Sequence, residues 1–404
     1  MSPIRNGCRA DRAAFWCSLG ASPSETRELV AYTEPAFDFS DLPTALPLPD
    51  EPFVETWASY VQTAERLGVW DALRGSLLEL RFPIERGISQ TQAYRAATRR
   101  GEVEERPPGK ATSCLIRPES LSLTLQQTPA GRIPVVCTRD RRDFETLVQA
   151  LTRRNEPWPV PGSLGACTVV GYNNLGRIFQ LRRAWQLASP QGSAADWQVR
   201  FREIAAQPDL YQDRFILLSS GPYSAVPAQE LGLAEEDWNR RSHVIRLEHE
   251  CTHYFTCRVL GSMRNALMDE LIADYMGIVA SEHRYRADWF LRFVGLEGFA
   301  RYRPDGRLEN YRGEPPLSDG AFVALQRAVV RAATNLEAID LSQRSGRRPD
   351  GPSEKGWTIV TLARMSLEDL ACTDAPRLFR DAWARDFLRT REPASAFDQI
   401  TISS

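Results

Sequence analysis

Lysine and histidine are scarce in this sequence. Only Lys110, Lys355 and four histidines occur among 404 residues, and arginine carries almost all of the positive charge. This bias is typical of a GC-rich bacterial genome, so it predicts no phosphate-binding site. With 50 Lys and Arg against 52 Asp and Glu, the net charge of -2 argues against a general attraction to nucleic acid or to an anionic membrane.

Long apolar runs and paired cysteines are also missing. No stretch approaches the roughly 18 consecutive apolar residues of a membrane-spanning helix. The first twenty residues carry scattered charges in place of the apolar centre of a signal peptide. The eight cysteines are dispersed without a Cys-x-x-Cys pair, as expected of reduced, buried thiols. These features predict a cytoplasmic protein with no membrane partner.

Two common catalytic motifs are absent as well. The sequence contains no Gly-x-Ser-x-Gly nucleophile elbow and no Gly-rich loop ending in Gly-Lys-Ser/Thr. It is therefore not expected to be a serine hydrolase of that type or a P-loop nucleotidase.

The pattern of apolar residues predicts an α+β protein with two regions. We expect a mixed α/β N-terminal region of unknown role at 1–160, and a region at 161–404 with a small, mostly antiparallel sheet and a mainly helical C-terminal part. A Pro-rich run at 42–50 is typical of an extended connector. The expected strands are 121–126, 133–138, 167–170 (closed by a turn at 171–174) and 214–219. The main expected helices are 142–153, 178–205 with a break at 190–192, 238–260 and 263–281.

The segment 249–253 carries the clearest chemical signal. It reads His249-Glu250-Cys251-Thr252-His253, which is the His-Glu-x-x-His motif. On a helix, residues four apart lie about 40° from one another and one turn apart, so both imidazoles can bind one cation. Glu250 lies about 100° away, where it can reach a water on the metal. Two of only four histidines in this arrangement make a chance match improbable.

The rest of this helix is expected to be buried by an apolar stripe. The stripe consists of Val244, Leu247, Cys251, Tyr254 and Phe255. We interpret Cys251 as a packing residue of this stripe, in preference to a metal ligand.

The next helix offers a third ligand. Glu270 and Asp274 lie one turn apart on it, beside the small residues Ala273 and Gly277. Glu270 is the natural third ligand, and Asp274 can accept the second N–H of a ligating histidine. A solvated acidic face is the alternative for this pair, and it is the interpretation we favour for Asp269.

His-Glu-x-x-His followed on the next helix by Glu-x-x-x-Asp resembles the gluzincin branch of the zincin metallopeptidases. The resemblance covers about thirty residues, and the rest of the chain matches no family that we could name. It implies one Zn²⁺ per chain, held by His249, His253 and Glu270. It also implies Glu250 as the general base and Asp274 as the support of a histidine ligand.

Two further features are expected by analogy only. In zincins an edge strand that precedes the motif helix binds extended peptide. The corresponding strand here would be 215–218. The alternative is that this strand has only a structural role. An oxyanion also needs a hydrogen-bond donor opposite the zinc. The candidates are Tyr254, Tyr275, His283, Arg284 and Tyr285, each with an ordinary core or surface role as the alternative.

The sequence thus predicts a zinc-dependent metallopeptidase or amide hydrolase that acts on a peptide or peptide-like substrate. One alternative is an enzyme of specialised metabolism that uses a zincin scaffold for other chemistry. The other is a non-catalytic, zincin-like binding protein, although such a protein has no use for Glu250. The sequence does not predict an oligomeric state.

Overall fold

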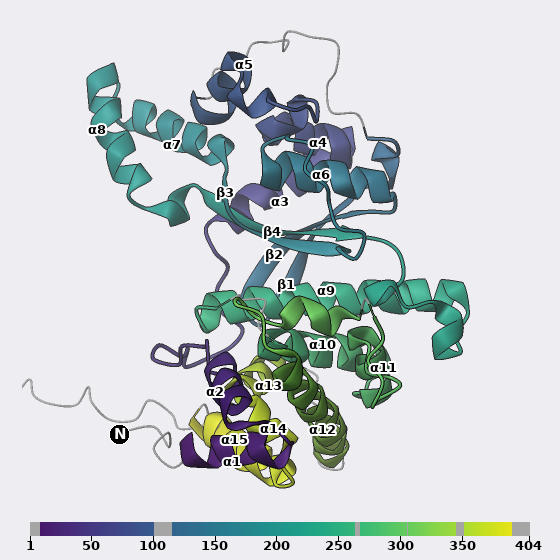
Figure 1. The fold of residues 1–404 in the computed structure, drawn as a ribbon. Helices are drawn as coiled ribbons and strands as arrows, with labels where there is room; N and C mark the ends of the chain where they lie inside the picture. The colour runs from purple at the N-terminus through teal and green to yellow at the C-terminus, as the bar shows by residue number, and fades with distance from the viewer. Residues whose placement is uncertain (1–8, 101–114, 263–266, 305, 345–350, 390–404) are drawn as a thin grey trace, which may run out of the picture. The chain divides into compact units, whose positions relative to one another are not determined.

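The chain forms two compact units in the computed structural model, which describes residues 9–100, 115–262, 267–304, 306–344 and 351–389. Unit 2 is Pro49–Cys251, and unit 1 combines Met1–Leu48 with Thr252–Ser404. The boundary after Cys251 falls inside one continuous helix, α9 (Glu235–Val259). The described residues are mainly helical with one small sheet, which confirms the α+β class (Figure 1).

Unit 2 is built on a four-stranded sheet. Its strands are β1 (Ser122–Thr128), β2 (Gly131–Thr138), β3 (Ala166–Asn173) and β4 (Gln212–Ser219), in the order β1-β2-β4-β3. The β1/β2 and β3/β4 pairs are antiparallel, and the β2/β4 pair is parallel. A small sheet is thus present, but it is mixed, and its strands β1 and β2 precede residue 160 and so lie outside the region 161–404 in which it was expected.

Helices cover one face of this sheet. These helices are α3 (Phe53–Leu67), α4 (Val69–Ser76) and α6 (Arg141–Arg153), and Asp140 caps α6 by accepting from two of its first backbone N–H groups. The core between helices and sheet contains Trp57, Phe144 and Phe215, all fully buried. Because side chains alternate along a strand, Thr168 and its partner Ile216 point to the opposite face, toward Glu250 of α9.

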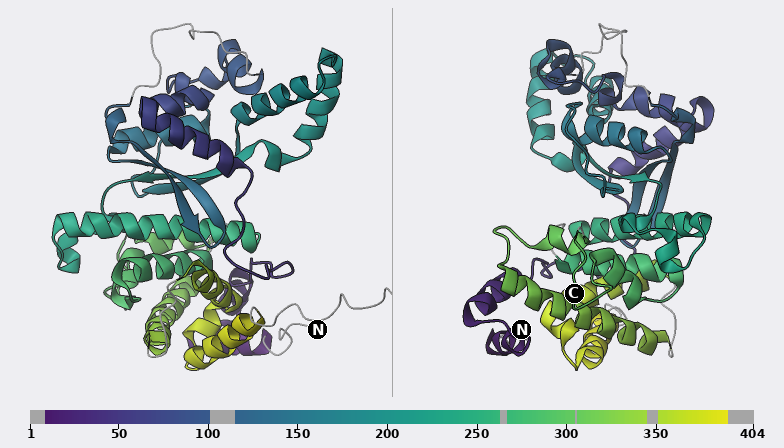
Figure 2. Two further views of the ribbon diagram at one scale, coloured as in Figure 1. Left: turned by 180° about the vertical axis from the view of Figure 1, so that it is seen from behind. Right: turned by 45° about the vertical axis from the view of Figure 1, so that its right-hand side comes forward.

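A helical hairpin projects from unit 2 (Figure 2). It consists of α7 (Leu175–Ala188) and α8 (Ala194–Ala205), separated at the break expected from residues 190–192. Ser193 starts α8 with a capping box to Asp196. The short helix α5 (Gln92–Arg95) lies earlier in the same unit.

A buried carboxylate anchors the base of this hairpin. Asp213, fully buried on β4, accepts hydrogen bonds from Trp57 Nε1 (2.8 Å), Asn174 Nδ2 (2.7 Å) and Arg177 Nη1 (2.8 Å). These partners stabilise a charge that would otherwise be costly to bury. Burial nevertheless raises the pKa of Asp213, against the effect of the three donors.

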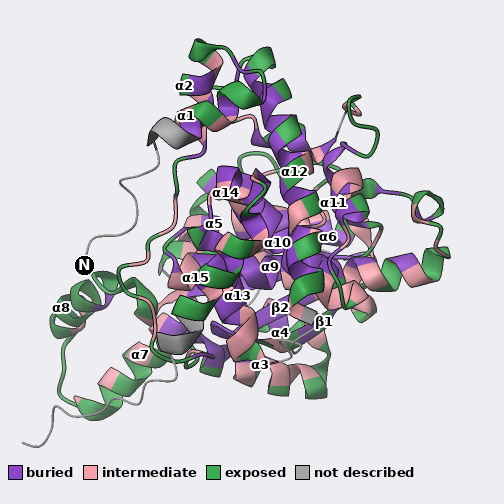
Figure 3. Ribbon diagram, turned by 90° about the horizontal axis from the view of Figure 1, so that it is seen from below, coloured by how far each residue is buried: buried purple, intermediate pink, exposed green. Residues whose placement is uncertain are grey.

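Unit 1 is helical throughout its described residues, as expected for the C-terminal part. Helix α10 (Leu267–Glu282) is buried along most of its length, as Figure 3 shows. No helix in the described ranges is both long enough and apolar enough to cross a bilayer. The other helices of this unit are α1 (Arg9–Ser18), α2 (Pro23–Tyr32), α11 (Ala287–Val294), α12 (Asp319–Arg344), α13 (Pro352–Arg364), α14 (Leu367–Ala371) and α15 (Ala375–Arg389).

Glu368 ties the N-terminal helices of unit 1 to its C-terminal helices. Its Oε1 accepts hydrogen bonds from Arg12 Nε (3.0 Å), Trp16 Nε1 (2.9 Å) and Thr33 Oγ1 (2.7 Å). Glu368, Arg12 and Trp16 are all buried. Segments more than 330 residues apart in the sequence are thus joined at one carboxylate.

The structure corrects four other expectations about the fold. Residue 160 is not a boundary between compact units, because residues on both sides of it share the core of unit 2. The expected turn at 171–174 is a continuation of β3, which passes Gly171 through an irregularity in register. Strand β4 is internal, so its edges are already paired and strand addition cannot occur there. Val244, expected in the buried stripe of α9, is exposed, whereas Ile245 is fully buried.

Replacing Glu368 tests the role of this carboxylate. We expect Glu368→Ala to lower the free energy of unfolding by about 3–5 kcal/mol, because Arg12, Trp16 and Thr33 would lose their shared buried acceptor and Arg12 would keep only the half-exposed Glu34 as a charge partner. Glu203→Ala, which removes an exposed ion pair with Arg200, serves as the control and should cost less than about 1 kcal/mol. Urea unfolding followed by circular dichroism measures both. Equal effects would show that Glu368 does not hold the unit together.

Candidate metal centre

Helix α9 places the two motif histidines one turn apart. Its first turn carries Glu235, Glu236 and Asp237. These negative side chains stabilise the helix because they lie at the positive end of its dipole. The helix enters the interior at the motif, where His249 is 6% exposed, His253 7% and Glu250 9%. The motif therefore lies in a nearly buried environment.

Helix α10 adds Glu270 to this pair, as expected. The potential ligand atoms of His249, His253 and Glu270 all lie within 4.8 Å of one another, and His253 Nε2 is 3.5 Å from Glu270 Oε1. Two ligands of a tetrahedral zinc ion, each about 2.0–2.2 Å from it, lie roughly 3.3 Å apart. Two imidazoles and one carboxylate are also a donor set that suits this ion. The three residues thus fit a divalent metal.

Tyr223 lies behind His249. Its Oη is 2.9 Å from His249 Nδ1. If His249 donates from Nδ1 to the tyrosine oxygen, its Nε2 is left with a lone pair for a metal. Tyr223 therefore orients this ligand, and it was not identified from the sequence.

Arg246 fixes the loop that carries Tyr223. Its guanidinium donates to the backbone oxygens of Ser219, Gly221 and Pro222, and it lies over the Tyr223 ring at 5.8 Å. Arg246 is one helical turn before Glu250 and is itself buried. Burial lowers the pKa of Arg246, while Tyr223 and Glu250 act in the opposite direction.

Asp269 supports His253, which corrects the expectation that it lies on a solvated face. Asp269 is 2% exposed, and its Oδ2 lies 3.3 Å from His253 Nδ1. Thr256 Oγ1 lies 3.0 Å from Asp269 Oδ1, within hydrogen-bonding distance. Asp269 is thus at ion-pair distance from one of the two motif histidines.

Asp274 makes a different interaction. It is fully buried and forms an ion pair with Arg307, from the 3-10 helix η8 (Arg307–Tyr311). At the other end of η8, Tyr311 Oη donates to Glu270 Oε2 at 2.8 Å. This bond fixes Oε2 of Glu270, and Oε1 is the oxygen that lies 3.5 Å from His253 Nε2.

The charges around His253 favour a cation. Burial disfavours its imidazolium form, but Asp269 and Glu270 outweigh burial and raise the pKa of His253 well above its usual range. Burial also raises the pKa of Tyr311, and Glu270 and Asp274 add to this effect. Tyr311 is therefore a neutral donor to Glu270 at physiological pH.

Glu250 is held by the sheet. Thr168 Oγ1, on β3, donates to Glu250 Oε2 at 2.6 Å. Strand β3 lies at the end of the strand order, so the edge strand near the motif is β3 and not β4. The second oxygen of Glu250 can therefore face the triad while the first is fixed.

The expected oxyanion donors have different surroundings. Tyr275 Oη donates to Asp340, and Tyr285 packs its ring on Tyr275 at 5.1 Å. His283 and Arg284 are exposed beyond the end of α10, and Tyr254 is fully buried.

The residues missed from the sequence had little to mark them. Asp269 directly precedes Glu270, and this adjacency was the one available signal. The other three residues lie in segments whose distance along the sequence from the motif gives no sign of a link to it. Thr168 was expected on a strand, and Tyr223 and Tyr311 were expected in loops.

A family model described as "Family of unknown function (DUF7005)" matches residues 15–374, and the chain belongs to that family. No curated protein and no solved structure matches the chain.

Two matched variants on α10 separate the roles of its buried aspartates. We expect Asp269→Asn to weaken zinc binding by metal-depleted protein about 10- to 100-fold, because His253 loses its supporting carboxylate. Asp274→Asn should change zinc affinity less than Asp269→Asn and should lower stability instead, because it leaves Arg307 without this partner. Competition with a chromophoric chelator gives the affinities, and thermal unfolding gives the stabilities. A larger loss of affinity in Asp274→Asn would restore the assignment implied by the resemblance.

Proposed function

We propose that this member of a family of unknown function is a zinc-dependent hydrolase that cleaves a peptide or peptide-like amide. The observation that carries the proposal is the convergence of His249, His253 and Glu270, with Glu250 beside them. Each of these four side chains has a neighbour that fixes its orientation. A metal with a purely structural role would not explain why Glu250 is held at this place.

The chain's residues have separate tasks in this mechanism. When bound, zinc supplies a Lewis acid that acidifies water and polarises a carbonyl. Glu250 accepts a proton from the attacking water and returns it to the leaving amine. Thr168 holds one oxygen of Glu250, so the other is directed at the reacting atoms. The near burial of the site limits competing water.

Charge balance supports hydrolysis over simple metal storage. With zinc, the two imidazoles and Glu270 leave a charge of +1, which would stabilise an oxyanion. Asp269 neutralises part of this charge through His253. The proposal also places the enzyme in the cytoplasm.

Zinc content and the Glu250→Gln variant test the proposal. We expect about one zinc per chain in the wild type by plasma mass spectrometry, and loss of zinc in His249→Ala and in Glu270→Ala. Glu250→Gln should keep its zinc and lose activity about 10²- to 10⁴-fold, because it cannot accept a proton. Mass spectrometry of a digested peptide library measures this activity.

Each outcome of this test has a distinct meaning. A wild type that takes up no zinc, even when zinc is supplied without chelator, would contradict the proposal. If the protein binds zinc and the Glu250→Gln variant has the same phenotype as the wild type, the protein is a non-catalytic binding protein. Zinc with hydrolysis of small acyl amides but of no peptide would indicate an enzyme of specialised metabolism.

Thr168 gives a second, independent test. We expect Thr168→Val to lower kcat/KM at least about 10-fold, because a hydrogen bond to a charged group contributes about 1.5–3 kcal/mol. Thr168→Ser keeps the hydroxyl and should retain most of the activity. Zinc content should be unchanged in both variants. Equal activity of the Val and Ser variants would show that the bond to Glu250 has no part in catalysis.

A further inference from the structure

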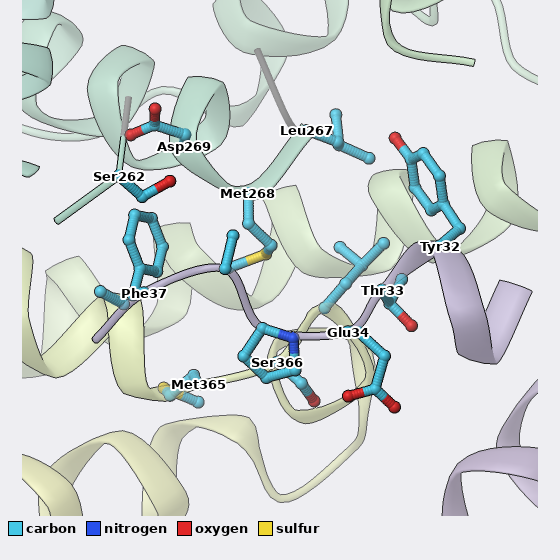
Figure 4. A pocket seen from close by; sticks show the side chains of 14 residues that line it. Tyr32, Thr33, Glu34, Phe37, Ser262, Leu267, Met268, Asp269, Met365 and Ser366 are labelled. Atoms are coloured by element: carbon cyan, nitrogen blue, oxygen red, sulfur yellow. The ribbon is translucent and has the colours of Figure 1, made fainter. Parts of the chain in front are cut away.

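Unit 1 contains a pocket on the other side of the residues that support the triad. It encloses about 560 Å³ of space, part of it open to solvent. Its walls are the segment 32–37, Ser262, the first turn of α10 at 267–269, and residues 363 and 365–367. Figure 4 shows segment 32–37 crossing the pocket opposite Leu267 and Met268.

The chemistry of the walls selects the kind of ligand. Most of the lining is apolar, including Phe37, Leu267, Met268 and Met365. The described lining contains two carboxylate side chains, Glu34 and Asp269, and no Lys, Arg or His. Glu34 forms an ion pair with Arg12, which is not part of the lining, at 3.0 Å. An anionic ligand would therefore meet the carboxylate of Asp269 and no cationic side chain in the described wall of the pocket.

A buried hydroxyl supplies a specific polar contact. Ser262 is 5% exposed, and its Oγ has no hydrogen-bond partner among the described residues. A buried polar group left without a partner costs free energy, so a ligand that bonds to it gains affinity. Figure 4 shows this side chain on the wall beside Phe37.

The wall formed by segment 32–37 is anchored at both ends. Tyr32 Oη donates to the backbone oxygen of Tyr311, and Asp38 N donates to the backbone oxygen of Leu260 at 2.9 Å. This wall is therefore held in place before a ligand binds, so its ordering does not oppose binding.

The pocket and the metal centre share residues by two routes. Asp269 lines the pocket and lies against His253. Tyr32 lines the pocket and bonds to Tyr311, which donates to Glu270. Two of the three triad residues are thus one or two contacts away from any ligand in the pocket.

We propose that this pocket binds a small apolar molecule with an amine or hydroxyl group, and that binding is transmitted to the metal centre through Asp269 and Tyr311. The amine or hydroxyl bonds to Ser262, and the apolar body packs on Phe37 and Met268. The transmission rests on the proposed function, whereas binding itself does not.

Ligand binding is tested on the full chain with named probes. In saturation-transfer NMR we expect signals from benzylamine and benzyl alcohol, and none from benzoate. Ser262→Ala should weaken binding of both probes about three- to tenfold, which is the range for one hydrogen bond. Ala36→Phe, which fills the pocket from segment 32–37, should abolish binding. Circular dichroism of both variants confirms that they are folded.

The outcomes separate this proposal from the proposed function. Absence of transfer to both probes, equal binding of benzoate, or unchanged binding in both variants would overturn the ligand site. With Co²⁺ in the triad, benzylamine should shift the visible absorption of the wild type and not of Ala36→Phe. Binding without a shift would overturn the transmission alone. If the protein takes up no metal, the zinc measurement contradicts the proposed function, and the NMR result still tests the ligand site.

Discussion

The burial of charge on two consecutive helices is the constraint on which the structure of this site depends. His249, Glu250, His253, Asp269, Glu270 and Asp274 are each at most 9% exposed. Charges withdrawn from water are tolerated only when they are paired or bind metal. Asp274 has Arg307, and Glu250 has Thr168. His253 lies against both Asp269 and Glu270, so an added cation at this place would meet two carboxylates.

The same constraint explains why the supporting residues come from distant segments. Tyr223 precedes α9, Tyr311 follows α11, and Thr168 lies on the sheet. Tyr223 and Thr168 each provide one polar atom to a side chain of the motif, and Tyr311 provides one to Glu270. Elsewhere, Asp213 and Glu368 are buried carboxylates with three donors each. Both units are thus organised around buried charges whose partners arrive from far along the chain.

The sequence predicted the parts of the site whose residues lie close together on one helix. The spacing of His249 and His253 defines their geometry on any helix, and the next acidic helix made Glu270 a rational choice. The strands around Pro129–Gly131 and the break at residues 190–192 were also predictable, because turn residues act locally. The expectation that Asp269 lies on a solvated face was wrong, because it is buried beside His253, whereas Asp274 forms an ion pair with Arg307. Both are acidic and near Glu270, and only the packing of α10 decides which one faces His253.

Long-range pairing accounts for the remaining errors. Strand order cannot be read from alternation alone, and the parallel pairing of β2 with β4 is what places β3 at the edge beside Glu250. The unit that contains the N-terminal helices was missed for the same reason, since Arg12 and Glu368 are 356 residues apart. A division at residue 160 would expose one core, whereas the observed division keeps each buried carboxylate with its donors. The pairing of buried charges is therefore a better guide to the units of this chain than sequence order.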